Sequence, residues 1–176
     1  MQYVELIMDK IIDNQYFKCY YVVIIISIKL RGYIIMFKGK VVIVGASNVG
    51  SAVLTKLLDF QLASEIALID LNENKCKGEA LDANDATSCI HSLNIRTYYG
   101  DYSDCKDADL IIITAGPSIK PGEKADRLIL SKTNCKIMSS VMSEITKYTK
   151  DALILMITNP LDVATYHVST QFDYPR

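Results

Sequence analysis

The sequence predicts an α/β fold in which helices cover both faces of a parallel sheet, a doubly wound sheet. From Lys38 onward, apolar runs of strand length alternate with longer segments of helical periodicity. The runs are nearly continuous in Val, Ile and Leu, which is typical of strands buried on both faces. With 176 residues, 50% of them hydrophobic, the chain suffices for one domain with a sizeable core.

The first part of this pattern predicts two strand–helix units and a third strand. KVVIVG begins the sheet, and EIALIDL repeats the same kind of buried run. Residues 48–60 between them have helical spacing of four apolar side chains: Val49, Val53, Leu57 and Leu58. A helix with a polar face is expected over residues 72–89. NIRTYYG alternates apolar and polar residues, which predicts a third strand less buried than the others.

The second part predicts two more strands, each followed by a helix. DLIIITAG is a fourth apolar run that Gly116 and Pro117 bring to an end, and ALILMITN is a fifth. A long helix over residues 126–149 separates them, and a short helix starts at Pro160. Six apolar residues can form the inner stripe of the long helix: Leu128, Leu130, Ile137, Met138, Val141 and Ile145.

Charge and cysteine content exclude several classes of protein. The net charge is −1 without a basic stripe, so nucleic acid is not an expected partner. The five cysteines are scattered, with no paired spacing and no histidine cluster beside them. We therefore expect neither a disulfide framework nor a metal site, and we expect a reducing, cytoplasmic location.

Residues 1–37 differ from residues 38–176 and form an atypical leader. Their apolar run from Cys19 to Ile28 is too short to span a bilayer, which takes roughly 18 residues, and acidic residues precede it, unlike in a signal peptide. Two interpretations stay open: an additional strand-like or helical extension, or a natural start at Met36 that makes the leader non-native. The second is favoured, and attachment to a membrane through residues 19–37 is a weaker alternative.

The turn after the first strand suggests a dinucleotide-binding site of Rossmann type. Gly45, Ser47 and Gly50 occupy the places of three glycines that let backbone N–H groups and a helix N-terminus meet a pyrophosphate. The Cβ of Ser47 crowds the closest approach between the backbone and the pyrophosphate, although the Ser47 hydroxyl can donate a hydrogen bond to phosphate. Asp70 ends the second strand twenty residues after Gly50, where a carboxylate can bind the ribose hydroxyls. The alternative for Asp70 is a helix N-cap.

Asp70 also favours NAD over NADP. The additional phosphate of NADP would approach the carboxylate, and two like charges about 4 Å apart repel by ~4 kcal/mol at an effective dielectric of 20. The sequence therefore predicts NAD as the cofactor.

With these residues in view, the chain resembles the amino-terminal half of the L-lactate/malate dehydrogenase family. Five segments carry the resemblance in family order and spacing: VVIVGASNVGSAV, ALIDLNENKCKGEALD, GDYSDCKDADLIIITAG, KPGEKADRLIL and ITNPLDV. The resemblance covers residues 39–176 and implies a Rossmann-type sheet. It also implies that the sixth strand and the substrate domain lie beyond Arg176, which would leave the fifth strand as a bare apolar edge.

The resemblance implies positions for the cofactor and the substrate. Around the dinucleotide it places Val49, Asp70, Lys75, Tyr102, Gly116, Pro117, Asn134, Ser140 and Asn159. Around the substrate it places Ile119, Arg127, Asn159 and Asp162.

Arg127 and Asn159 are the residues that we expect to act in catalysis. A hydride that reaches a keto carbon leaves negative charge on the oxygen, and the guanidinium of Arg127 would stabilise that charge as its loop closes. Outside the family context, Arg127 would be a solvated charge at a helix N-terminus. The Asn159–Pro160 bond is a candidate cis peptide that would direct Asn159 into the cleft, and an ordinary turn is the alternative.

Two departures from the family pattern bear on the substrate. The loop before Arg127 is two residues longer, with Lys124 and Ala125 as the additional residues; an ungapped alignment would instead put Ala125 in the place of the arginine. Ile119 stands where malate enzymes carry an arginine, so a second substrate carboxylate would be unpaired. A 2-oxo monocarboxylic acid such as pyruvate is therefore favoured, although Lys120 leaves malate dehydrogenase as an alternative.

The sequence thus predicts an NAD-dependent L-2-hydroxyacid dehydrogenase, most like L-lactate dehydrogenase. His91 and His167 match no family motif, and the proton-transfer histidine of the family would lie after Arg176. We therefore expect an inactive fragment, and a non-catalytic NAD-binding module is the competing interpretation. Full-length relatives are homo-oligomers, and no membrane partner is expected.

Overall fold

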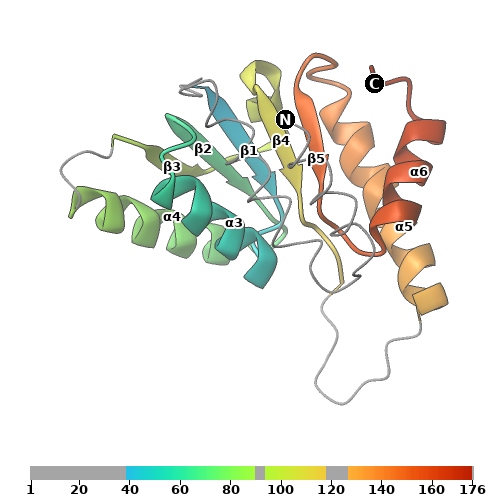
Figure 1. The fold of residues 1–176 in the computed structure, drawn as a ribbon, viewed down its shortest axis with the longest axis horizontal. Helices are drawn as coiled ribbons and strands as arrows, with labels where there is room; N and C mark the ends of the chain where they lie inside the picture. The colour runs from blue at the N-terminus through green and yellow to red at the C-terminus, as the bar shows by residue number, and fades with distance from the viewer. Residues whose placement is uncertain (1–38, 90–93, 118–126, 176) are drawn as a thin grey trace, which may run out of the picture. The chain divides into compact units, whose positions relative to one another are not determined.

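The computed structural model describes residues 39–89, 94–117 and 127–175. They fold into a five-stranded parallel sheet flanked by helices (Figure 1). The strands are β1 (Lys40–Val44), β2 (Glu65–Ile69), β3 (Arg96–Tyr99), β4 (Leu110–Ile113) and β5 (Leu153–Met156). The helices are α3 (Asn48–Asp59), α4 (Glu73–Ser88), α5 (Arg127–Ile145) and α6 (Leu161–Gln171), with a 3₁₀ helix, η1 (Tyr102–Asp107).

The strand order is β3-β2-β1-β4-β5, and every neighbouring pair is parallel. This is the order of the doubly wound dinucleotide-binding fold through its fifth strand, so the predicted fold class is confirmed. In β1, Val41 pairs with Ile66 on one side and with Leu110 on the other, which makes β1 the central strand.

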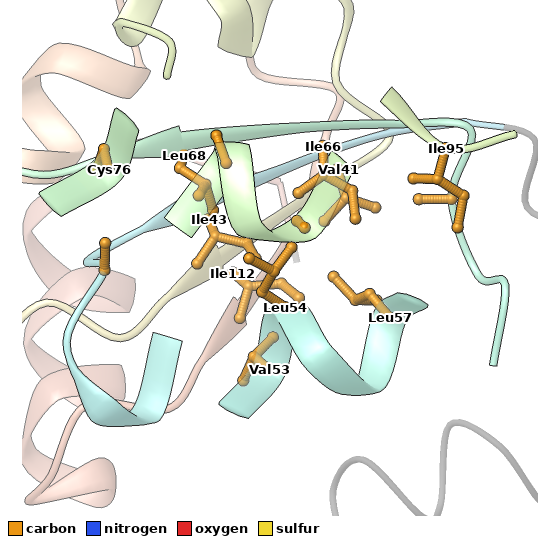
Figure 2. Close-up of a cluster of buried hydrophobic side chains, with 14 of the residues drawn as sticks. Val41, Ile43, Val53, Leu54, Leu57, Ile66, Leu68, Cys76, Ile95 and Ile112 are labelled. Atoms are coloured by element: carbon orange, nitrogen blue, oxygen red, sulfur yellow. The ribbon is translucent and has the colours of Figure 1, made fainter. Parts of the chain in front are cut away.

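Alternate strand residues face opposite layers of the core. Val41 and Ile43 face α3 and α4, together with apolar residues of the neighbouring strands, as the labelled side chains of Figure 2 show. Val42 and Val44 face α5, α6 and η1. Because the central strands are buried on both faces, their sequences lack polar alternation, and each fully buried aliphatic side chain stabilises the fold by about 1.5–3 kcal/mol.

The inner stripe of apolar residues predicted for the long helix can be compared with the buried residues of α5. Met138, Val141 and Ile145 are buried, and Ile137 packs against them. The helix ends earlier than the predicted residue 149, because Lys147 and Tyr148 donate backbone bonds to the carbonyls three residues before them, which tightens the last turn. The prediction for the Leu128 side chain falls outside the described residues.

The structure also shows how the third strand and the segment after it compare with the sequence analysis. β3 is the less buried strand that its alternation predicted, since Arg96 and Tyr99 are exposed. No element was predicted in the segment GDYSDCKDA, which contains η1; Asp101 and Asp104 make a reciprocal capping box at the start of this helix.

The leader, residues 1–37, lies outside the described residues, so its boundary and origin stay predictions. Within the ranges described above, no helix combines the length and the apolar character needed to cross a bilayer. The same ranges contain no group of three or more His, Cys, Asp or Glu side chains that could hold a metal ion.

Candidate dinucleotide-binding site

The candidate site lies at the carboxyl ends of β1 and β4. The chain leaves β1 toward α3, which packs on one face of the sheet, and leaves β4 toward α5, which packs on the other. Since β1 and β4 are neighbours, the topological switch point of the sheet lies at their carboxyl ends. Ligands of open α/β sheets bind at such a switch point.

The turn between β1 and α3 depends on two glycines. Gly45 has φ +109°, and a Cβ there would lie 2.7 Å from the Thr114 hydroxyl oxygen. A Cβ on Gly50 would lie 1.9 Å from the Gly45 carbonyl oxygen, so glycine lets α3 start directly against the turn. These contacts leave the turn open for backbone N–H groups to approach an anion.

Ser47 is the N-cap residue of α3, in an extended conformation. Its side chain makes no capping hydrogen bond, although serine commonly does so in this position. The hydroxyl is therefore not committed to the helix terminus, which is compatible with the role expected from the sequence.

Asp70 joins the end of β2 to this turn. Its Oδ2 accepts a hydrogen bond from the Ala46 N–H at 2.7 Å, and its Oδ1 accepts one from the Asn72 N–H at 2.9 Å. Asn72, not Asp70, caps α4, because the Asn72 side chain accepts from the Lys75 N–H. The N-cap alternative for Asp70 is thus wrong, and its half-buried carboxylate lies beside the turn.

The ends of β4 and β5 are joined by buried polar side chains. Asn134 of α5 is 3% exposed, and its amide nitrogen donates to the Asn159 carbonyl oxygen. Its Oδ1 is buried without a hydrogen-bond partner and lies 3.6 Å from where a Cβ of Gly116 would be. The Asn159–Pro160 bond is cis, as the sequence suggested.

The other expected cofactor residues differ in exposure. Val49, in the first turn of α3, is 45% exposed, and Pro117 is also exposed. Tyr102 begins η1 and is half-buried; burial, and then nearby acidic groups that include Asp70, raise the pKa of its hydroxyl. Ser140 is exposed on α5.

The substrate residues are described less completely. Asp162 is exposed in the first turn of α6, and Arg127 is the first residue of α5. Ile119, Lys120, Lys124 and Ala125 lie outside the described residues, as does the side chain of Arg127. The loop alignment and the choice of substrate therefore stay predictions.

His167 has a structural position. It lies half-buried on α6 with its Nε2 2.7 Å from the Ser139 hydroxyl oxygen of α5, so the pair links the two helices. This agrees with the structural or surface role expected for it, whereas His91 lies outside the described residues.

Sequence reasoning missed Thr114 and Thr158. Each is buried within two residues of the end of a strand, and its hydroxyl donates to a loop carbonyl beyond the neighbouring strand. The available signal was a single polar residue that ends a continuous apolar run, in IIIT and LMIT.

Comparison with known proteins identifies the family. Residues 39–176 match the family model described as lactate/malate dehydrogenase, NAD binding domain. L-lactate dehydrogenase of Selenomonas ruminantium is 70% identical over 137 residues, which are 78% of this chain and 43% of that protein. L-lactate dehydrogenase 2 of Clostridium acetobutylicum is 55% identical over 139 residues, 79% of this chain and 43% of that protein.

Solved structures show the same relationship. The minor L-lactate dehydrogenase of Enterococcus mundtii matches with a TM-score of 0.71 and 36% identity over 78% of this chain and 43% of that one. Malate dehydrogenase of Salinibacter ruber matches with a TM-score of 0.66 and 32% identity over 77% of this chain and 42% of that one. The chain thus spans less than half the length of these relatives. It belongs to the lactate/malate dehydrogenase family, of which residues 39–176 are the NAD-binding domain.

Proposed function

We propose that the chain binds NAD at the carboxyl ends of β1 and β4. We also propose that it is the cofactor domain of an NAD-dependent L-2-hydroxyacid dehydrogenase, with pyruvate as the favoured 2-oxo acid. One observation carries the cofactor site: the Asp70 carboxylate accepts the Ala46 N–H at 2.7 Å, directly beside a turn whose close packing requires glycine at positions 45 and 50. The 70% identity with an L-lactate dehydrogenase supports the reaction.

Two further features of the proposed site fit a dinucleotide. A Cβ at Gly45 would clash with Thr114 and Ala115 and one at Gly50 with the Gly45 carbonyl, so the tight turn that a pyrophosphate requires depends on both glycines. The buried Oδ1 of Asn134 has no hydrogen-bond partner in the described structure, and a donor of the ligand could provide one. In the proposed site, Asp70 accepts from the ribose hydroxyls. The remaining contacts come from Ser47 of the turn and from the residues that the resemblance implies: Val49, Lys75, Tyr102, Gly116, Pro117, Asn134 and Ser140.

When bound, the reduced cofactor, NADH, would supply the hydride, and residues of the chain would hold the reacting carbonyl. Arg127 donates to the keto oxygen, where negative charge develops, and the Asn159 amide orients the same oxygen. Ile119 and Asp162 border the substrate in this proposal. Ile119 disfavours a second carboxylate, because that charge would be buried unpaired.

We propose that neither histidine of this chain transfers the proton, because His91 and His167 match no family motif. His167 bonds Ser139 between α5 and α6. We therefore propose that the 176-residue chain binds NAD with little or no turnover by itself. We also propose a cytoplasmic location and assembly into homo-oligomers. The four described cysteines, which are free, are compatible with a reducing compartment.

A chimera tests the reaction. Residues 39–176 would replace the matching segment of the Selenomonas ruminantium enzyme, and NADH oxidation would be followed with pyruvate, oxaloacetate and 2-oxoisocaproate. We expect turnover with pyruvate above that with oxaloacetate. A preference for oxaloacetate would favour the malate alternative, and a folded chimera that binds NADH without turnover would favour the non-catalytic module.

The same chimera tests Arg127. Arg127→Gln removes the proposed donor to the keto oxygen and should lower kcat about 100-fold or more. Lys124→Gln removes a charge from the same loop and should leave kcat nearly unchanged. Equal losses in the two variants would contradict the assignment.

A further inference from the structure

The backbone carbonyl of Gly45 lies directly beyond β1, at the start of the turn before α3 that is proposed to bind the cofactor. The backbone ladder of β1 ends with the Thr114 N–H, which donates to the Val44 carbonyl at 2.8 Å, and with the Gly45 N–H, which donates to the Ile69 carbonyl at 2.7 Å. The positive φ of Gly45 then directs its own carbonyl out of the ladder. The hydroxyl of Thr114 donates to this carbonyl at 2.8 Å.

The next strand repeats this arrangement. The Ile157 N–H donates to the Ile113 carbonyl at 2.9 Å as the ladder between β4 and β5 ends. One residue later, the hydroxyl of Thr158 donates to the Ala115 carbonyl at 2.8 Å. Each threonine therefore binds a carbonyl within two residues of the end of the neighbouring strand: Thr158 holds the loop after β4, and Thr114 holds the turn after β1.

Packing alone does not call for a hydroxyl at these positions. Thr114 is 6% exposed and Thr158 is 5% exposed, and valine has the same shape without the cost of burying a polar group. The hydroxyl is useful here because a buried carbonyl without a donor is destabilising. Thr97 of β3 provides the contrast, since its hydroxyl is equally buried but has no hydrogen-bond partner and lies away from both loops.

The turn is consequently held from both of the strands that flank β1. Asp70 accepts the Ala46 N–H from the side of β2, and Thr114 donates to the Gly45 carbonyl from the side of β4. The N–H groups that would meet a pyrophosphate belong to this same short segment, and their directions depend on how its peptide planes are fixed.

We propose that Thr114 and Thr158 are positioning residues for the dinucleotide: Thr114 fixes the turn at Gly45, and Thr158 fixes the loop at Ala115 and Gly116. Neither side chain needs to touch the ligand, because each acts through the carbonyl that it binds. The inference rests on the proposed NAD binding and adds two residues on which the affinity depends.

The test is NADH binding to the full chain, followed by the fluorescence of NADH. Thr114→Val keeps the shape and removes the donor, and should weaken binding about tenfold. Thr114→Ser keeps the hydroxyl and should restore most of the affinity. Thr97→Val is the matched control, a buried threonine without a hydrogen bond, and should bind like the unaltered chain. Thermal unfolding of each variant shows how much stability it has lost.

Each outcome decides the inference. Affinity unchanged in Thr114→Val, or reduced equally in Thr97→Val, overturns it while leaving the proposed NAD binding intact. Absence of NADH binding to the unaltered chain overturns both. If Thr114→Val fails to fold, Thr158→Val replaces it. Weaker binding by Thr158→Val then supports the inference, and unchanged binding contradicts it.

Discussion

Gly50 and Gly78 are both helical glycines, but an added methyl group would have opposite effects at the two positions. A Cβ on Gly50 would lie 1.9 Å from the Gly45 carbonyl oxygen, whereas nothing lies within 4 Å of a Cβ on Gly78 in α4. Close packing of the helix against the turn requires glycine at position 50, whereas no contact in the described structure requires glycine at position 78.

We therefore predict that Gly50→Ala abolishes measurable NADH binding and lowers the free energy of unfolding by on the order of 2 kcal/mol, because α3 must move away from the turn. Gly78→Ala should raise the free energy of unfolding by roughly 0.5–1 kcal/mol, since alanine favours the helix. Urea denaturation and NADH titration check both variants. Similar stability of the two would contradict the close approach at Gly50.

At this scale the sequence predicted some residues of the site and missed others. Gly45, Gly50 and Asp70 follow from a local pattern, because the turn and the acidic strand end recur at fixed spacing. The partners of Thr114 and Thr158 could not be predicted in this way. Their bonds join segments 69 and 43 residues apart, and such a partner is known only once the strand order is known.

Among the elements, η1, the first residues of β1 and β2, and Tyr98 within β3 share one polar cluster. The Lys40 ammonium lies 2.7 Å from an Asp104 carboxylate oxygen and 3.9 Å from one of Glu65. The Tyr98 hydroxyl is 2.7 Å from the same two carboxylates. The cluster thus ties η1 to Tyr98 of β3 and to the amino ends of β1 and β2, which are opposite the carboxyl ends where the cofactor turn lies.

This cluster predicts a loss of stability in acid. Burial by itself would raise the pKa of Asp104, but hydrogen bonds from Lys40, Tyr98 and the Asp101 N–H outweigh it, so the pKa lies below its ordinary value of 3.8. A lowered pKa in the folded state means that the carboxylate contributes stability above about pH 4 and loses it as the pH falls through the folded pKa. Urea denaturation between about pH 6 and 2 should show this loss, with a weaker pH dependence in Asp104→Asn. An identical dependence in the variant would contradict the assignment.

The elements themselves were predicted well, and their ends less so. Apolar runs located four of the five strands and alternation located β3, but residues such as Leu71 and Asn159, at the ends of the apolar runs, belong to loops. The 3₁₀ helix η1 escaped prediction because its stability comes from the Asp101–Asp104 capping box and the Lys40 ion pair, not from apolar periodicity.

For the molecule as a whole, the two edges of the described sheet differ. At β3, the Asn84 side chain of α4 binds both the N–H and the carbonyl of Thr97, at 3.0 and 2.7 Å, so the edge is partly covered. At β5, Leu153 is 66% exposed. An apolar residue exposed on an edge strand invites pairing with another chain, which is the hazard that the sequence suggested for this strand.

We predict that the chain associates through β5 and that Leu153→Lys reduces this association, because a lysine on an edge strand opposes pairing. Light scattering over a range of protein concentrations would measure the effect, and circular dichroism would verify the fold. Leu81→Lys is the matched control, since Leu81 is 61% exposed on a helix. Equal effects of the two substitutions would indicate a general effect of charge and contradict a role for the edge.

The cofactor preference of the full chain tests the account most directly. NADH and NADPH would be titrated into the unaltered chain and into Asp70→Ser. We predict saturable NADH binding, NADPH binding weaker by about 100-fold or more, and a much smaller difference between the two in Asp70→Ser, because the variant lacks the charge that repels the additional phosphate. An unaltered chain that binds neither cofactor, or an Asp70→Ser variant that keeps both the affinity for NADH and the preference over NADPH, would contradict the account.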